Sequence, residues 1–124
     1  MAHTYPKHEK LKSRTTIELL FSKGQSVTKY PLRLVYLPQT FDDGSAIKMG
    51  VSVSKKYFKR AADRNYYKRL LRECYRLHKA GLLDAMPQPH AMMLLYQSND
   101  RLDFAEIEQK TLALFEKFRA KTTS

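Results

Sequence analysis

Residues 47–79 are IKMGVSVSKKYFKRAADRNYYKRLLRECYRLHK, a strand pattern followed by a helix pattern. In the first seven positions, apolar residues alternate with glycine, serine or lysine, as in a strand with one buried face; these apolar residues are Ile47, Met49, Val51 and Val53. From residue 63 to residue 79 the apolar residues recur every three or four positions, which predicts an amphipathic helix. The chain therefore has a strand and a helix next to each other at its centre.

Patterns on either side of this stretch add two helices and three strands. The form Thr15-Thr16-Ile17-Glu18 is a capping box, and Gly24 is a natural stop, so a short first helix is expected between them. Two strands are expected at 27–30 and 32–37, separated by Pro31. A third is expected at 91–96, before a second capping box at 103–106 that begins a last helix. The predicted class is α+β, an α-β-β-β-α-β-α two-layer sandwich with helices packed against one sheet.

Length and composition bound the organisation of the chain. At 124 residues with 43% hydrophobic residues, it fits one domain with a modest core. We expect a single domain over residues 1–124, ordered from about residue 10 to about residue 118, with flexible tails. No apolar run approaches the roughly 18 to 20 residues that cross a bilayer, and no apolar segment follows the basic N-terminus, so we predict a cytoplasmic location.

The charge is concentrated in one segment. The chain carries a formal net charge of +11, with 23 Lys and Arg against 12 Asp and Glu. Residues 55–79 hold ten of those cations and only two of the acidic residues, for a segment charge of +8. A polyanion is the expected partner of such a surface, and this segment is its predicted binding site.

A helical wheel of residues 63–79 separates an apolar arc from a basic arc. The predicted core arc contains Tyr66, Tyr67, Leu70, Leu71, Cys74 and Leu77. The opposite arc carries Arg64, Asn65, Lys68, Arg69, Arg72, Arg76 and Lys79, with Glu73 near its edge. Like charges four residues apart destabilise an isolated helix by a few tenths of a kcal/mol, and a bound polyanion would offset this. A helix face that is only solvated usually carries charges of both signs. Because this face carries almost only positive charges, nucleic-acid binding is the favoured interpretation.

No catalytic centre is apparent in the sequence. The histidines, His3, His8, His78 and His90, are scattered, and no metal site can be assembled from their spacing. Cys74 and His78 lie four residues apart, but nothing nearby orients the imidazole, and a buried structural thiol is the commoner case. The four glycines form no phosphate-binding loop. We therefore expect no catalytic residue and no bound metal in the protein itself.

The basic helix also carries a family signature. It contains Arg64-Asn65 and then Lys68-Arg69-Leu70-Leu71-Arg72-Glu73, after the strand end Ser52-Val53-Ser54-Lys55-Lys56. This combination resembles the signature of the bacterial ribonuclease P protein subunit. The resemblance extends over roughly residues 10–118, since the helix ending at Gly24, the strand with Tyr36 and the last strand and helix also fall where that family has them.

The resemblance implies a fold and a function. The fold would be like the second domain of ribosomal protein S5, with a left-handed β-α-β crossover through the basic helix. The protein would be the subunit of an RNA-based endonuclease that removes the 5′ leader from precursor tRNA. Its partners would be the catalytic RNA and precursor tRNA, with no membrane involved. The RNA would supply the active site and hold Mg²⁺, which makes the protein a non-catalytic component.

The resemblance also implies two sets of site residues. Contacts to the RNA subunit are expected from Lys55, Lys56, Lys59, Arg60, Arg64, Asn65, Lys68, Arg69, Arg72 and Arg76. A cleft for the single-stranded leader is expected from Ile17, Phe21 and Tyr36. The sequence departs from the family pattern at Tyr66, where the third residue of the family's Arg-Asn-Arg motif is an arginine, and at Ile17, where the first helix has an aromatic. Phe21 can also be interpreted as a plain core residue, four positions from Ile17.

Two other classes of protein share some of these features. A ribosomal or RNA-chaperone protein without a role in cleavage would have the same charge and α+β layout, but no reason to combine an Arg-Asn helix motif with an aromatic cleft. A DNA-binding regulator would need a helix-turn-helix, and residues 47–53 before the basic helix are predicted to form a strand instead. Combining the protein with a ribonuclease P RNA would separate these classes, because neither of the other two classes should stimulate tRNA 5′ maturation.

Overall fold

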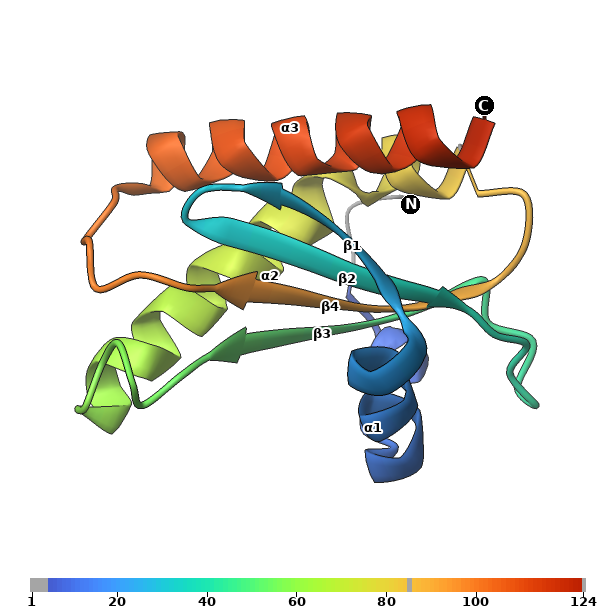
Figure 1. Ribbon diagram of the computed structural model, residues 1–124, viewed down its shortest axis with the longest axis horizontal. Coiled ribbons are helices and arrows are strands. Elements are labelled where there is room, and N and C mark those ends of the chain that lie inside the picture. Colours follow the sequence, from blue (N-terminus) through green and yellow to red (C-terminus); the bar gives the residue numbers. More distant parts are fainter. Residues whose placement is uncertain (1–4, 85, 124) are drawn as a thin grey trace.

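The computed structural model describes residues 5–84 and 86–123 (Figure 1). Its helices and strands follow the predicted α-β-β-β-α-β-α order, with one short 3₁₀ helix added at the start. The elements are η1 (Lys7–Glu9), α1 (Arg14–Lys23), β1 (Gln25–Lys29), β2 (Leu32–Pro38), β3 (Ile47–Val53), α2 (Ala61–Asp84), β4 (His90–Tyr96) and α3 (Phe104–Thr123). Packed structure therefore extends beyond the expected 10–118 at both ends, and residues 1–4, 85 and 124 lie outside the described residues.

The helix ends agree only in part with the predicted caps. At α3, Asp103 Oδ1 accepts from the Glu106 backbone N–H at 2.8 Å and Glu106 Oε1 accepts from the Asp103 N–H at 3.3 Å, which confirms the second capping box. At α1 the prediction was two residues out of place, because the N-cap is Ser13, whose hydroxyl accepts from the Thr16 N–H at 3.3 Å. A serine two residues before Thr15 competes for the same role.

The four strands form one sheet in the order β1-β2-β4-β3. β2 pairs antiparallel with β1 and β4, whereas β3 and β4 are parallel neighbours joined by α2. In Figure 1, β3 and β4 both point to the left, β4 lies above β3, and α2 passes behind them. This arrangement is a left-handed β-α-β crossover, as the family resemblance implies and against the usual right-handed rule.

The sheet has a helix layer on one face and α1 on the other. Alternate residues of β2 separate the two: Leu34 and Tyr36 pack with α2 and α3, while Val35 packs with Leu20 of α1. The sheet and the α2–α3 pair are the two layers that the sequence predicted, and they hold the larger hydrophobic core. α1 covers only part of the other face, which we call the open face (Figure 1).

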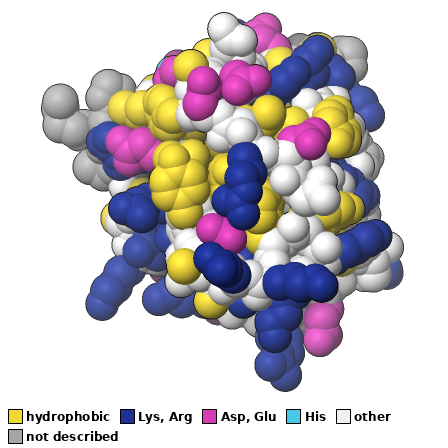
Figure 2. Space-filling model, turned by 90° about the vertical axis from the view of Figure 1, so that its left-hand side faces the viewer, with side chains coloured by type: hydrophobic (Ala, Val, Ile, Leu, Met, Phe, Trp, Pro, Cys, Tyr) yellow, Lys and Arg dark blue, Asp and Glu magenta, His cyan; other side chains and the backbone are white. Residues whose placement is uncertain are grey.

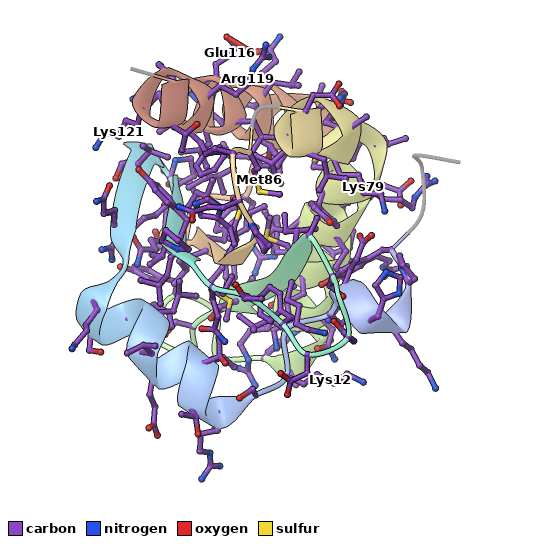
Figure 3. The ribbon with its side chains drawn as sticks, turned by 90° about the vertical axis from the view of Figure 1, so that its right-hand side faces the viewer. Lys12, Lys79, Met86, Glu116, Arg119 and Lys121 are labelled. Atoms are coloured by element: carbon purple, nitrogen blue, oxygen red, sulfur yellow. The ribbon has the colours of Figure 1, made fainter. Side chains whose placement is uncertain are left out.

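The N-terminal segment, residues 5–11, runs along the open edge of β3. The backbone carbonyl of Met49 accepts from the Leu11 N–H at 3.1 Å and from the Tyr5 hydroxyl. Glu9 reaches α2, where its carboxylate accepts from Lys79 Nζ at 2.9 and 3.1 Å and from the Tyr75 hydroxyl at 2.8 Å. Figure 3 places Lys79 between α2 and this segment. The segment therefore covers an edge strand and anchors it to α2.

Cys74 provides a probe of this packing. Its side chain is fully buried under α3, and burial raises the pKa of the thiol to about 11. The thiolate is the reactive form, so at about pH 8 only about one thiol in a thousand is reactive. We expect a thiol-directed aromatic disulfide reagent to modify Cys74 only as fast as the protein unfolds, and rapidly in concentrated guanidinium chloride. Rapid modification of the folded protein would contradict this burial.

Candidate nucleic-acid interface

The ten predicted RNA-contacting residues lie in one continuous part of the surface, which we call the basic face. It consists of Lys55, Lys56, Lys59 and Arg60 in the β3–α2 connection and Arg64, Asn65, Lys68, Arg69, Arg72 and Arg76 on α2. The four cations of the connection are all exposed, and the six residues on α2 are exposed or half-buried. Figure 2 looks at the end of the molecule where α2 begins, and Lys and Arg side chains gather in its lower half. The structure thus brings this predicted set together.

Arg64 has a structural role within the basic face. Its guanidinium Nη1 donates to the backbone carbonyls of Phe58 at 2.9 Å and Lys59 at 2.8 Å. These bonds tie the β3–α2 connection to the first turns of the helix. Arg64 therefore orders the loop that carries four of the cations, and replacing it would disturb more than one phosphate contact.

The two acidic residues within the segment are each paired with an arginine. Asp63 Oδ2 lies 3.1 Å from Arg101 Nη2, and this hydrogen bond lowers the pKa of the Asp63 carboxyl. Glu73 accepts from Arg76 Nε at 3.1 Å, one helical turn away, which lowers the pKa of the Glu73 carboxyl. Arg101 comes from outside the segment, so it adds a cation that sequence reasoning did not assign to this surface. The acidic residues thus detract little from the positive potential.

Two positions differ from the helical wheel. Tyr66 was predicted to be core, but 46% of its surface is exposed, because the first turns of α2 extend past the sheet. Lys79 was predicted on the solvent arc, but only 4% of it is exposed, because the N-terminal segment and Glu9 cover it. A helical wheel assumes that the same side of a helix faces solvent along its whole length. In α2, the segments that pack on each side differ from one end of the helix to the other.

A cleft of about 280 Å³ lies between α1, the N-terminal segment and the open face of the sheet. We call it the outer cleft, and its lining residues are Tyr5, Lys10, Leu11, Lys12, Ile17, Gly50, Val51, Arg72 and Met93. Apolar side chains and Gly50 line it together with three cations, of which Arg72 also belongs to the basic face. Figure 3 shows Lys12 at the lower end of the molecule, near the start of α1. The basic face and the outer cleft therefore meet at Arg72.

Gly50 lines the outer cleft, and it has no side chain to fill the space beside Met93 and Leu11. A Cβ at this position would lie 3.0 Å from Met93 Cε and 3.5 Å from Leu11 Cβ. The sequence signal for this residue was a glycine inside a strand pattern, which often marks a close approach. Lys10 and Lys12 carried no comparable signal, because a basic N-terminal segment is common on solvated surfaces.

The predicted trio Ile17, Phe21 and Tyr36 is not brought together. Ile17 lines the outer cleft, and Phe21, half-exposed, follows one turn later on the same side of α1. Tyr36 instead lies on the opposite face of the sheet, 4% exposed, with its ring 4.8 Å from that of Phe118 in α3. The prediction for Tyr36 was wrong because residues 34–38 of β2 are all apolar, and alternation within such a run cannot assign the face of each residue.

Within residues 5–84 and 86–123, no three His, Cys, Asp or Glu side chains gather as a metal ion would require. Over the same residues, none of the helices combines the length and the apolar character that crossing a membrane requires. The outer cleft and the basic face instead combine exposed cations with apolar or aromatic surface. That combination suits a single-stranded or folded nucleic acid.

Sequence comparisons connect this surface with known proteins. The family model described as Ribonuclease P matches residues 5–119. The ribonuclease P protein component of Porphyromonas gingivalis ATCC 33277 is 40% identical over 106 residues, which are 83% of this chain and 77% of the relative. That of Chlorobaculum tepidum is 32% identical over 124 residues, covering 94% of this chain and 76% of the relative.

Solved structures share the fold. The RNase P protein of Staphylococcus aureus superimposes with a TM-score of 0.72 at 19% identity, covering 88% of this chain and 94% of that one. The RNase P protein of Thermotoga maritima gives a TM-score of 0.70 at 24% identity, covering 88% and 96%. At these identities the likeness concerns the fold, including the helix that carries the basic face.

Proposed function

The chain belongs to the ribonuclease P protein family, and from this membership we propose how it works. Members of the family are components of the RNA-based enzyme that matures the 5′ end of tRNA, in which the RNA carries the catalytic activity. In our proposal the basic face binds the catalytic RNA, and the outer cleft binds the single-stranded 5′ leader of precursor tRNA. Precursor tRNA is thus the second partner, and the site of action is the cytoplasm.

The basic face is the observation that supports this proposal most strongly. Nine cations and one amide, from Lys55 to Arg76, share one side of the molecule, and Asp63 and Glu73 are each held by an arginine. Lys and Arg side chains bind phosphates and release counterions, and this supplies affinity for a folded RNA without reading its sequence. The guanidinium groups among them add paired hydrogen bonds to phosphate oxygens.

The outer cleft has the composition that single-stranded RNA requires. Lys10, Lys12 and Arg72 can follow the phosphates, while the apolar surface around Ile17 and Met93 accepts the bases. Phe21 extends this surface along α1 and offers a ring for stacking. Because Arg72 borders both regions, a leader in the outer cleft would lie next to the catalytic RNA.

The protein's part in cleavage is therefore positioning. Its side chains would hold the RNA and the leader in register, which lowers the entropic barrier of the reaction. The Mg²⁺ ions belong to the RNA in this proposal, since phosphate oxygens are the hard ligands that Mg²⁺ prefers.

Phe21→Ala provides the test of the leader site. We expect it to weaken binding of precursor tRNA to the reconstituted complex about fivefold or more, because a base loses its stacking surface. Binding of mature tRNA, which has no leader, should be unchanged. Equilibrium binding measurements with both RNAs give the ratio of the affinity for precursor tRNA to the affinity for mature tRNA. Tyr36 is unsuitable for this test, because truncating a buried aromatic costs about 3 to 5 kcal/mol of stability.

Leu19→Ala is the matched control for this experiment. Leu19 lies on the same helix and is 37% exposed, but it does not line the outer cleft. Its replacement should leave both affinities as they are. If Phe21→Ala leaves the ratio of the affinities for precursor tRNA and mature tRNA unchanged, the leader lies elsewhere on the protein.

A further inference from the structure

Tyr66 is the one large apolar side chain of the basic helix that the structure leaves exposed. Among the described residues, five large hydrophobic side chains are exposed, by 37% or more: Leu19, Phe21, Tyr30, Tyr66 and Leu112. Of these, only Tyr66 lies between cations of the basic face, with Asn65 before it and Lys68 and Arg69 after it. An isolated exposed aromatic needs no explanation, but one placed within a phosphate-binding surface suggests a ligand with a flat ring.

The ring of Tyr66 is held in place by its neighbours. It meets the ring of Tyr67 at 84°, with 5.0 Å between the centroids. Tyr67 is buried and stacks on Phe58 at 4.8 Å and 23°, so the exposed ring rests on an aromatic cluster of the core. The guanidinium carbon of Arg69 lies 6.0 Å from the centroid of Tyr66. A ring fixed in this way loses little conformational freedom when a ligand stacks on it.

The hydroxyl of Tyr66 does not account for its exposure. This hydroxyl makes no hydrogen bond with any other group of residues 5–84 and 86–123. Tyr30 is the contrasting case, because its hydroxyl lies within hydrogen-bond distance of Ser98 Oγ at 3.0 Å and Asp100 Oδ2 at 3.3 Å. Tyr30 thus has an intramolecular role on its own part of the surface, whereas Tyr66 presents its ring to a partner.

We propose that Tyr66 stacks on one unpaired base of the RNA bound to the basic face, while Arg69 and Lys68 bind the adjoining phosphates. This inference rests on the proposed function and adds a base contact to a surface otherwise suited to phosphates. A neutral ring attracts no phosphate by charge, whereas every base has a face that can stack on it. The contact therefore favours an unpaired nucleotide over a continuous duplex, in which the bases are already stacked.

Affinity measurements with a transcribed bacterial ribonuclease P RNA test the proposal. Tyr66→Ala should weaken binding about fivefold to 100-fold, and Tyr66→Phe should bind like the wild type because it keeps the ring. The dependence of log K on log salt should be the same for Tyr66→Ala as for the wild type, because no phosphate contact is lost. Tyr30→Ala is the matched control and should not change the affinity.

A fluorescent variant gives an independent readout. The chain has no tryptophan, so the indole introduced by Tyr66→Trp is the sole one. Stacking on a base should quench its emission when the RNA is added, whereas the emission of a Tyr30→Trp variant should not change. Circular dichroism of each free variant should match the wild type, since both positions are exposed.

Three outcomes would overturn the stacking site. If Tyr66→Ala binds the RNA as tightly as the wild type, the ring makes no contact with the RNA. If Tyr66→Ala and Tyr66→Phe lose the same affinity, the contact is made by the hydroxyl instead of the ring. A shallower salt dependence in Tyr66→Ala would show that its effect is on phosphate contacts. In each of these cases the wild type still binds the RNA, so the proposed function stands. A wild type that does not bind the RNA would remove the proposed function as well.

Discussion

We expect the triple variant Lys55→Ala, Lys59→Ala, Lys68→Ala to bind a bacterial ribonuclease P RNA about 100-fold more weakly than the wild type. Each lost phosphate contact should cost about 1 kcal/mol or more, and about 1.4 kcal/mol is a factor of ten in affinity. The slope of log K on log salt should fall by about 2 to 3, since each neutralised phosphate contributes 0.7 to 0.9. The loss should be the same for substrates with and without a leader.

These three lysines suit the test because the folded protein does not use them. Their ammonium groups form no hydrogen bond or ion pair with the described residues, whereas Arg64 orders a loop and Arg72 borders the outer cleft. The matched control is Lys23→Ala, Lys29→Ala, Lys110→Ala, which removes the same charge from other surfaces. If both triple variants lose the same affinity, net charge rather than the basic face governs binding.

The second large effect concerns stability, and it follows from replacing Lys79 with methionine. The side chains of Lys79 and Glu9 are only 5% and 12% exposed, so the variant leaves a carboxylate with little access to water and without its ammonium partner. Breaking a buried ion pair from one side costs about 3 to 5 kcal/mol of unfolding free energy. Urea denaturation followed by circular dichroism measures this cost.

A double variant and a surface variant complete this experiment. Glu9→Gln combined with Lys79→Met removes both charges, so it should recover much of the stability lost in Lys79→Met alone. Glu116→Gln breaks the exposed pair with Arg119, which Figure 3 shows on the outer side of α3, and should cost less than about 1 kcal/mol. If Lys79→Met is no more destabilising than Glu116→Gln, Glu9 does not anchor the N-terminal segment to α2.

The attachment of the N-terminal segment to α2 should also affect the affinity for the leader. Tyr5, Lys10, Leu11 and Lys12 form one side of the outer cleft, and the Glu9–Lys79 pair holds that side against α2. Destabilising the pair should therefore reduce leader binding even under conditions where the protein remains folded. Glu9 would act on the leader only by positioning its neighbours.

The order of the elements could be predicted because each has its own local signal. The alternation from Ile47 to Val53 and the helical period after Asp63 gave the central strand and helix, and the class followed from the sequence of such patterns. The handedness of the crossover had no such signal, since it depends on which face of the sheet α2 covers. It was available only from the resemblance to a family.

The positions that sequence reasoning misplaced share one cause. Tyr66, Lys79 and Tyr36 lie in correctly predicted elements, but their exposure depends on segments that are distant in the chain. Lys79 is covered by Glu9, 70 residues away, and Tyr36 by Phe118. Periodicity assigns a residue to one side of its own helix or strand, whereas burial is decided by what packs there.

Reconstitution tests the central claim most directly. Precursor tRNA with a 5′ leader would be incubated with a bacterial ribonuclease P RNA, at a Mg²⁺ concentration at which the RNA alone cleaves slowly, with and without this protein. We predict faster cleavage at the mature 5′ end when the protein is present, and none with protein and Mg²⁺ alone. Cleavage by the protein without RNA would contradict a non-catalytic subunit. Tight binding of the RNA without faster cleavage would contradict the assignment to tRNA maturation and favour an RNA-binding protein of another kind.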